Sequence, residues 1–239
     1  MTSKALKLIS ASKTDTGKVR QLNEDAVFNR PERGIFAVAD GMGGHTAGEV
    51  ASGMLVEALA KIRPPPRLSE LVEFAEYHIL AVNKYLYEYG QSKQQITGST
   101  IVALLVSDDF CAYIWAGDSR LYRMRDGSLE QLTTDHTQTE LYIEQGLIER
   151  KDAEKFASRN RITRAVGAAA DLILDVEVAE LIPGDRFLLC SDGLDKHLLH
   201  DEIEETMRNG SADIVSDNLI AQTLERGAND NVTVCIVDI

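Results

Sequence analysis

The decisive stretch of this sequence is Ile35-Phe36-Ala37-Val38-Ala39-Asp40-Gly41-Met42-Gly43-Gly44-His45. Its apolar run predicts a buried strand over 35–39 that delivers the carboxylate of Asp40 to a sheet edge. The glycines that follow permit unusual backbone angles and close approach of a ligand. Because Asp-Gly is also ordinary turn chemistry, the stretch by itself does not identify a site.

Two helices are predicted after this glycine-rich turn. Apolar residues recur at helical spacing over 47–62, with Thr46 as the expected N-cap and Glu49 as its capping-box partner. A proline run over 63–67 ends this helix, and a second apolar face runs from 68 to 86. We expect the short proline run to join two antiparallel helices.

The rest of the chain is mainly β-rich. Alternating or continuous apolar patterns predict strands over 6–12, 26–29, 99–107, 110–116, 121–125, 129–132, 172–181, 186–190 and 232–237. The first two, with the strand over 35–39, are expected to form a meander. Two further helices are predicted over 201–208 and 211–226. Residues 137–161 are polar, carry charges of both signs and lack a clear core face, so we expect an appendage there.

Composition excludes several classes of function. A formal charge of −13 argues against sequence-independent binding to nucleic acid and against docking on anionic membranes. No stretch has the length of a membrane span, and residues 1–15 lack the apolar core of a signal peptide. The three cysteines lie in apolar runs, which predicts buried, reduced thiols. A cytoplasmic protein is therefore expected, and 239 residues suit one large domain or two small ones.

Carboxylates gather at the predicted strand ends. Three apolar strands end in an aspartate, a fourth aspartate precedes the last strand, and an acidic pair lies beside the second: Asp40, Asp118, Asp192, Asp230, Glu24 and Asp25. If these ends meet, the charges require raised pKa values or bound cations. An all-oxygen set suits Mg²⁺ or Mn²⁺. A single Asp-Gly in so acidic a chain is more often a turn than a ligand, so the two-metal site at a β edge is a hypothesis.

Short motifs also occur in a fixed order along the chain. They are Gly17-x-x-Arg20-x-x-Asn23-Glu24-Asp25, Val38-Ala39-Asp40-Gly41-Met42-Gly43-Gly44, Gly98-Ser99-Thr100, Gly117-Asp118-Ser119-Arg120, Asp135-His136, Ile162-Thr163-Arg164-Ala165-Val166-Gly167, Ser191-Asp192-Gly193 and Asp230-Asn231-Val232-Thr233. The series closely resembles the metal-dependent serine/threonine protein phosphatases of the protein phosphatase 2C (PPM) type, especially their small bacterial members. The match runs from near residue 15 to the last strand.

The resemblance implies an α+β fold of four layers, α-β-β-α. Two antiparallel β-sheets are flanked by a pair of helices on each side, and the metals lie at one end. The whole range 1–239 then forms a single catalytic domain. Residues 137–161 correspond to the variable flap subdomain beside the active site.

The resemblance also implies a ligand set for two core Mn²⁺ or Mg²⁺ ions and a third, weaker ion. Asp40 would bridge the two core metals, with the backbone carbonyl of Gly41 beside it. Asp192 and Asp230 would hold the first metal. The remaining ligands implied are Glu24 and Asp25 through metal-bound water, and Asp118 with Asp192 at the third metal.

The implied chemistry is direct hydrolysis by a water or hydroxide that bridges the metals. Arg20 would clamp the substrate phosphate through its planar guanidinium. Many eukaryotic members carry a catalytic histidine where this chain has Met42. His45 is a candidate proton donor, although a solvent-facing role or a metal-bound water is an equal alternative. Arg161, in the flap, is a candidate contact for substrate, with a solvated charged face as the default.

These features predict a cytoplasmic, monomeric phosphatase of phosphoserine and phosphothreonine proteins that opposes a bacterial serine/threonine kinase. Two other classes remain open. One is a catalytically inactive binding module that keeps the fold. The other is a metal-dependent phosphatase of small phosphorylated metabolites, or a nuclease, although the acidic composition disfavours nucleic acid.

Overall fold

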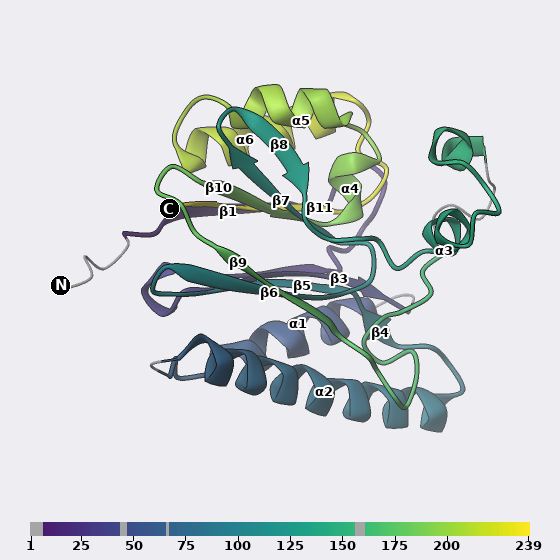
Figure 1. Ribbon diagram of the computed structural model, residues 1–239. Helices are drawn as coiled ribbons and strands as arrows, with labels where there is room; N and C mark the ends of the chain where they lie inside the picture. The colour runs from purple at the N-terminus through teal and green to yellow at the C-terminus, as the bar shows by residue number, and fades with distance from the viewer. Residues whose placement is uncertain (1–6, 44–46, 66, 156–160) are drawn as a thin grey trace.

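The computed structural model describes residues 7–43, 47–65, 67–155 and 161–239. Two β-sheets face each other, and helices cover the outer face of each sheet (Figure 1). Every strand pair is antiparallel. This arrangement confirms the predicted α-β-β-α sandwich.

The first sheet has the order β1-β11-β10-β7-β8. Its strands are β1 (Ile9–Asp15), β11 (Val232–Asp238), β10 (Arg186–Cys190), β7 (Arg120–Arg125) and β8 (Ser128–Gln131). The second sheet has the order β2-β3-β5-β6-β9, and a short strand pairs with β3. Its strands are β2 (Asp25–Arg30), β3 (Ile35–Met42), β5 (Ile101–Ser107), β6 (Phe110–Ala116), β9 (Asp175–Glu180) and the short β4 (Gly98–Ser99).

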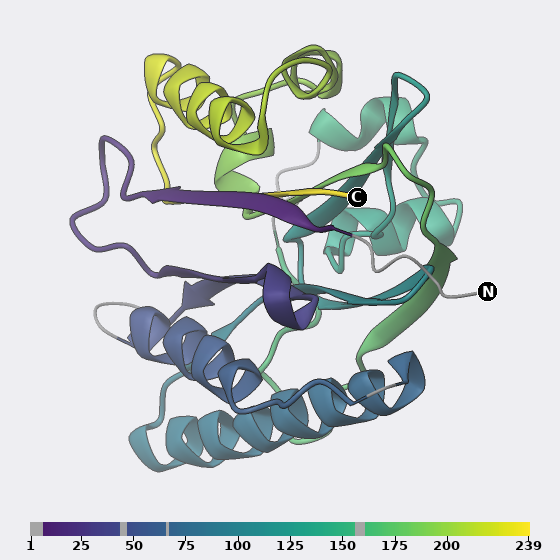
Figure 2. The ribbon, with the colours of Figure 1, turned by 90° about the vertical axis from the view of Figure 1, so that its left-hand side faces the viewer.

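Helices α1 (Ala47–Ala60) and α2 (Leu68–Lys93) lie side by side on the second sheet (Figure 2). Helices α5 (His200–Met207) and α6 (Ala212–Glu225) cover the first sheet. The remaining helical segments are short: η1 (Pro31–Arg33), α3 (Gln138–Glu144), η2 (Arg150–Lys155) and α4 (Asp192–Asp195). No helix in the described ranges is both long and apolar enough to span a membrane.

Three apolar cores hold these layers together. One lies between the sheets and includes Phe36, Trp115 and Phe187. A second packs α1 and α2 on the second sheet, and a third packs α5 and α6 on the first. The three cysteines are buried and none forms a disulfide, as the apolar runs around them predicted. Burial of so much apolar surface is the main stabilising contribution in a fold of this kind.

Two predictions about the first strands were wrong. The opening segments do not form a meander, because β1 pairs with β11 in one sheet while β2 pairs with β3 in the other. The strand predicted to end before Asp40 continues to Met42, since Gly41 and Met42 pair with Ser99 and Gly98 of β4. The glycine-rich stretch therefore begins as an ordinary strand.

Other elements differ from prediction mainly at their ends. Helix α2 extends beyond the apolar face that ends at Leu86 and continues through Gly90 to Lys93. Val50, predicted on the buried face of α1, is 53% exposed. Residues 137–155 lie beside the sandwich as an appendage, with α3 near its start (Figure 1). The N-cap of α3 is Thr137, whose Oγ1 accepts a hydrogen bond from the backbone N–H of Glu140.

Candidate metal centre and active site

The strand ends bring the predicted carboxylates to one end of the sandwich. The register of β2 and β3 places Asp25 opposite Asp40. Asp192 follows β10 as the first residue of α4, and Asp230 lies two residues before the neighbouring strand β11. Asp118 lies in the connection between β6 and β7. Strands from both sheets therefore contribute to one acidic cluster.

Asp40 lies at the centre of this cluster. Burial raises the pKa of its carboxyl group well above the ordinary value, and the negative charges of Asp25, Asp192, Asp118 and Asp230 raise it further. Its backbone N–H donates to the hydroxyl of Thr100 at 3.0 Å, and its carbonyl accepts from the backbone N–H of Thr100 at 2.8 Å. The charges of four neighbouring carboxylates therefore act on Asp40.

Asp25 connects the two sheets. Its Oδ2 accepts hydrogen bonds from Ser191 Oγ and Thr233 Oγ1, each at 2.7 Å. Ser191 is the N-cap of α4, but its hydroxyl is used for Asp25 instead of the helix N-terminus. Burial raises the pKa of Asp25 to about 6 even though these two hydrogen bonds oppose the shift.

The backbone at Gly41 has no room for a side chain. A Cβ there would lie 2.1 Å from the carbonyl oxygen of Gly48 and 2.6 Å from that of Glu24. The Gly41 N–H donates to the Glu24 carbonyl at 3.0 Å. A Cβ on Gly48 would in turn lie 2.3 Å from Glu24 Oε1. Close packing of these three residues fixes the acidic pair against the end of β3.

The position of Asp118 is fixed by hydrogen bonds between its neighbour Gly117 and His136, which lies just before the flap. The backbone N–H of Gly117 donates to His136 Nδ1 at 3.1 Å, and the His136 N–H donates to the Gly117 carbonyl at 2.9 Å. Gly117 has a φ of 119°, which an L side chain rarely adopts. Asp118 itself is only 6% exposed, and burial raises its pKa to about 8, with Asp192 adding to the effect.

Asp230 is the exception among these carboxylates, because side-chain cations contact both of its oxygens. Arg20 Nε lies 2.9 Å from Oδ1, and Lys196 Nζ lies 3.0 Å from Oδ2. Burial opposes the shift, but these two cations lower the pKa of Asp230 below its ordinary value. Lys196 also lies 2.6 Å from Asp192 Oδ2. The sequence analysis gave no role to Lys196.

The donor set fits hard divalent cations. Four of the acidic residues each keep one buried carboxylate oxygen without a hydrogen-bond partner among the described residues: Glu24, Asp25, Asp118 and Asp192. Such oxygens are unfavourable unless a cation or water satisfies them. Among the described residues, no three acidic, histidine or cysteine side chains yet converge closely enough to hold an ion. The chain's own cations occupy part of the cluster in this state.

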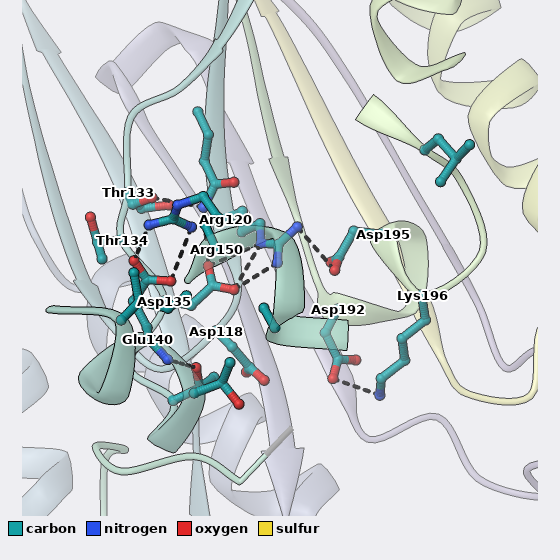
Figure 3. A pocket seen from close by; sticks show the side chains of 16 residues that line it. Asp118, Arg120, Thr133, Thr134, Asp135, Glu140, Arg150, Asp192, Asp195 and Lys196 are labelled. Atoms are coloured by element: carbon teal, nitrogen blue, oxygen red, sulfur yellow. Dashed lines mark hydrogen bonds and ion pairs between the residues drawn. The ribbon is translucent and has the colours of Figure 1, made fainter. Parts of the chain in front are cut away.

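A pocket of about 620 Å³ lies between this cluster and the flap. Asp118, Asp192 and Lys196 line one side, and Glu140 and Arg150 from the flap line the other (Figure 3). The volume suits a side chain with part of its backbone. The pocket therefore extends from Asp118 and Asp192 of the acidic cluster to the flap.

Arg120 lines this pocket and forms ion pairs with two other lining residues, Asp135 and Asp195. Its guanidinium makes a bidentate contact with Asp135, where the flap begins, and lies 3.0 Å from Asp195 of α4. Figure 3 shows Arg120 between these two carboxylates. Asp195 is a further buried carboxyl whose pKa burial raises to about 7. Sequence reasoning gave Arg120 and Asp195 no role.

Two predicted site residues remain to be placed, of which the structure describes only Arg161. His45, the candidate proton donor, lies outside the described residues. Arg161 is exposed and does not line the pocket. Its backbone carbonyl accepts a hydrogen bond from the N–H of Gln138, so it marks where the flap returns to the sandwich.

Known proteins resemble this chain along almost its whole length. The family model described as Protein phosphatase 2C matches residues 15–225. The serine/threonine protein phosphatase PstP of Mycobacterium tuberculosis is 33% identical over 96% of this chain, but the chain spans only 44% of the length of that protein. The serine/threonine phosphatase Stp of Listeria welshimeri is 33% identical, with 95% of this chain and 94% of that protein covered.

Solved structures show the same likeness. PppA, described as a key regulatory component of the type VI secretion system of Pseudomonas aeruginosa, superposes with a TM-score of 0.91 at 35% identity, covering 98% of both chains. The catalytic domain of PstP, solved in complex with two manganese ions, has a TM-score of 0.85 at 33% identity, covering 97% of both chains. On sequence and on fold, the chain belongs to the protein phosphatase 2C family.

Proposed function

We propose that this protein hydrolyses phosphoserine and phosphothreonine in phosphoproteins at a site that holds two Mn²⁺ or Mg²⁺ ions. The observation that carries the proposal is the set of buried carboxylates with unsatisfied oxygens around Asp40, with a guanidinium beside it. The manganese-bound structure of the relative PstP supports the choice of metal.

We propose for these residues the roles that the resemblance to the family implies, and their gathering at one end of the sandwich supports the proposal. We propose Asp40, the Gly41 carbonyl, Asp192 and Asp230 as direct ligands of the core metals. Glu24 and Asp25 would hold metal-bound water, because each keeps one unsatisfied oxygen. Asp118 and Asp192 would hold a third, weaker ion.

The bound metals would lower the pKa of a water molecule and offset charge on the phosphoryl oxygens. Arg20 would orient the substrate phosphate, since its side chain is 49% exposed while its Nε contacts Asp230. Either His45 or a water would supply the proton to the leaving alcohol. The pocket beneath the flap would receive residues next to the phosphorylated side chain. Arg161, which is exposed outside this pocket, would contact more distant parts of a substrate.

The proposal extends to the cellular setting. We expect one catalytic domain over 1–239, acting as a monomer in the cytoplasm on proteins phosphorylated by a bacterial serine/threonine kinase. The relatives named as serine/threonine phosphatases in Mycobacterium and Listeria support this assignment.

Hydrolysis assays with three substrates test the proposal. We expect Mn²⁺-stimulated turnover of p-nitrophenyl phosphate and of phosphothreonine peptides, and its loss with EDTA. Asp40→Asn and Asp192→Asn should remove activity while leaving the circular dichroism spectrum unchanged. Turnover of small phosphorylated metabolites without peptide turnover would favour a metabolite phosphatase. A folded protein without metal-dependent turnover of any substrate would be a binding module.

A further inference from the structure

Lys196 occupies an unexpected position in the acidic cluster. It is the C-cap of the short helix α4 and lies one turn after Asp192. Its ammonium contacts Asp192 Oδ2 at 2.6 Å and Asp230 Oδ2 at 3.0 Å. The side chain is 24% exposed, so most of it is withdrawn from solvent. Figure 3 shows the side chain extending to the Asp192 carboxylate.

The two carboxylates that share this ammonium are the pair proposed to hold the first metal. An ammonium group is a compact cation with three N–H donors, so it can bridge two carboxylates as a small metal ion does. The contacts hold one oxygen of each aspartate to Nζ. Asp230 has a side-chain cation on each oxygen, so a divalent ion that binds this carboxylate must displace one of them. Asp192 gives up its Oδ2 contact with Lys196 only if the ion takes that oxygen, because its Oδ1 has no partner among the described residues.

The opposite side of the cluster differs. Glu24 and Asp25 each keep a buried carboxylate oxygen that has no hydrogen-bond partner within the described ranges. Side-chain cations contact both oxygens of Asp230 and Oδ2 of Asp192, whereas the unpartnered oxygens of Glu24 and Asp25 have no such contact within the described ranges.

We propose that Lys196 is an internal counter-cation of the metal-free enzyme and that the first metal binds by displacing it from Asp192 and Asp230. This inference rests on the proposed function, because it assumes that these two aspartates are metal ligands. Breaking the contacts of Lys196 with Asp192 and Asp230 costs free energy only for the metal that binds these two aspartates. The two core metals should therefore bind with unequal affinity.

Calorimetric titration of metal-stripped protein with Mn²⁺ tests this inference. Lys196→Gln keeps most of the side-chain length and removes the charge. We expect two core binding steps in the wild type and one step about tenfold tighter in Lys196→Gln, a change of about 1.4 kcal/mol. The other step should stay within about twofold. Lys196→Arg should retain the wild-type affinities, because the guanidinium can replace both ion pairs.

Thermal unfolding gives a second readout that a purely structural lysine would not produce. In EDTA, Lys196→Gln should have a lower Tm than the wild type, because two neighbouring carboxylates lose their shared cation. In saturating Mn²⁺ it should gain more in Tm than the wild type does, because a ligand stabilises in proportion to its affinity for the folded state. Lys196→Gln should therefore lower Tm in EDTA and increase the rise in Tm that Mn²⁺ produces.

Two control variants separate displacement from a general charge effect. Arg20→Gln removes one positive charge from the other oxygen of Asp230, and Lys13→Gln removes a lysine paired with Asp217 away from the site. If Lys196→Gln leaves both steps unchanged, or tightens them no more than Arg20→Gln, the inference is wrong. If the wild type binds no Mn²⁺ at all, the proposed function itself fails.

Discussion

Replacing Gly48 and Gly53 with alanine, one at a time, should move the stability of the protein in opposite directions although both residues lie in α1. Alanine normally favours a helix over glycine because it loses less conformational entropy on folding. At Gly53 nothing lies within 4 Å of an added Cβ. At Gly48 the Cβ would lie 2.8 Å from the backbone carbon of Gly41 and 2.3 Å from Glu24 Oε1.

The magnitudes follow from these contacts. Gly53→Ala should raise the free energy of unfolding by about 0.5–1 kcal/mol, the full helix-propensity gain. Gly48→Ala should lower it by about 1–2 kcal/mol, because overpacking costs about 1–3 kcal/mol and only part is offset in the first helical turn. For a chain of this size, 1 kcal/mol corresponds to about 2–4 °C in Tm.

The assay is thermal unfolding of both variants in EDTA, followed by Mn²⁺ titration. Gly48→Ala should also weaken Mn²⁺ binding by about tenfold, because the clash displaces the Glu24 carboxylate and the Gly41 backbone that surround the metal centre. Gly53→Ala should bind Mn²⁺ as the wild type does. Equal stabilisation by the two substitutions, with unchanged Mn²⁺ binding, would refute the packing argument.

Three further predictions concern other parts of the structure. Arg20→Ala should raise KM for phosphopeptides far more than it lowers kcat, and an unchanged KM in steady-state assays would remove Arg20 from phosphate binding. Burial raises the pKa of Asp118 to about 8, so between about pH 4 and pH 8 this carboxyl binds more protons in the folded protein than in the unfolded chain. The Tm of the metal-free protein should therefore fall as pH rises from about 5 to about 8. Asp118→Asn should flatten this dependence in EDTA, and an equally steep profile would contradict it. Asn83→Leu should lower the free energy of unfolding in urea by about 2–4 kcal/mol without changing Mn²⁺ affinity, because it leaves the Gly167 N–H and two carbonyls at 169–170 unsatisfied. A loss below about 1 kcal/mol would argue against a stabilising role for these hydrogen bonds.

The sequence predicted the order and type of most elements because hydrophobic periodicity is a local property. Strands over 110–116 and 186–190 agree with β6 and β10 residue for residue. Partner choice is not local, and this is why the expected meander failed. Which strand β1 joins depends on residues more than two hundred positions away; for example, Thr14 and Thr233 are 219 positions apart and share a hydrogen bond.

The acidic cluster was predictable in composition but not in its internal pairing. Aspartates at strand ends were visible in the sequence, and the antiparallel register then brought Asp25 opposite Asp40. Lys196 was missed because Asp192-Gly-Leu-Asp-Lys resembles the end of a strand. The short helix α4 turns that spacing into an (i, i+4) contact. Predicting a helix over 192–195 would have indicated the contact between Asp192 and Lys196.

The position of β11 has a consequence for biosynthesis. It lies between β1 and β10, so the first sheet stays incomplete until Val232–Asp238 leaves the ribosome. Asn231 then accepts a hydrogen bond from the Glu24 N–H and donates to the carbonyls of Thr16 and Leu22, closing the loop that carries Arg20. A nascent chain therefore cannot assemble this catalytic centre. Such long-range closure slows folding, and the proposed hydrolytic activity should appear only after β11 has been synthesised.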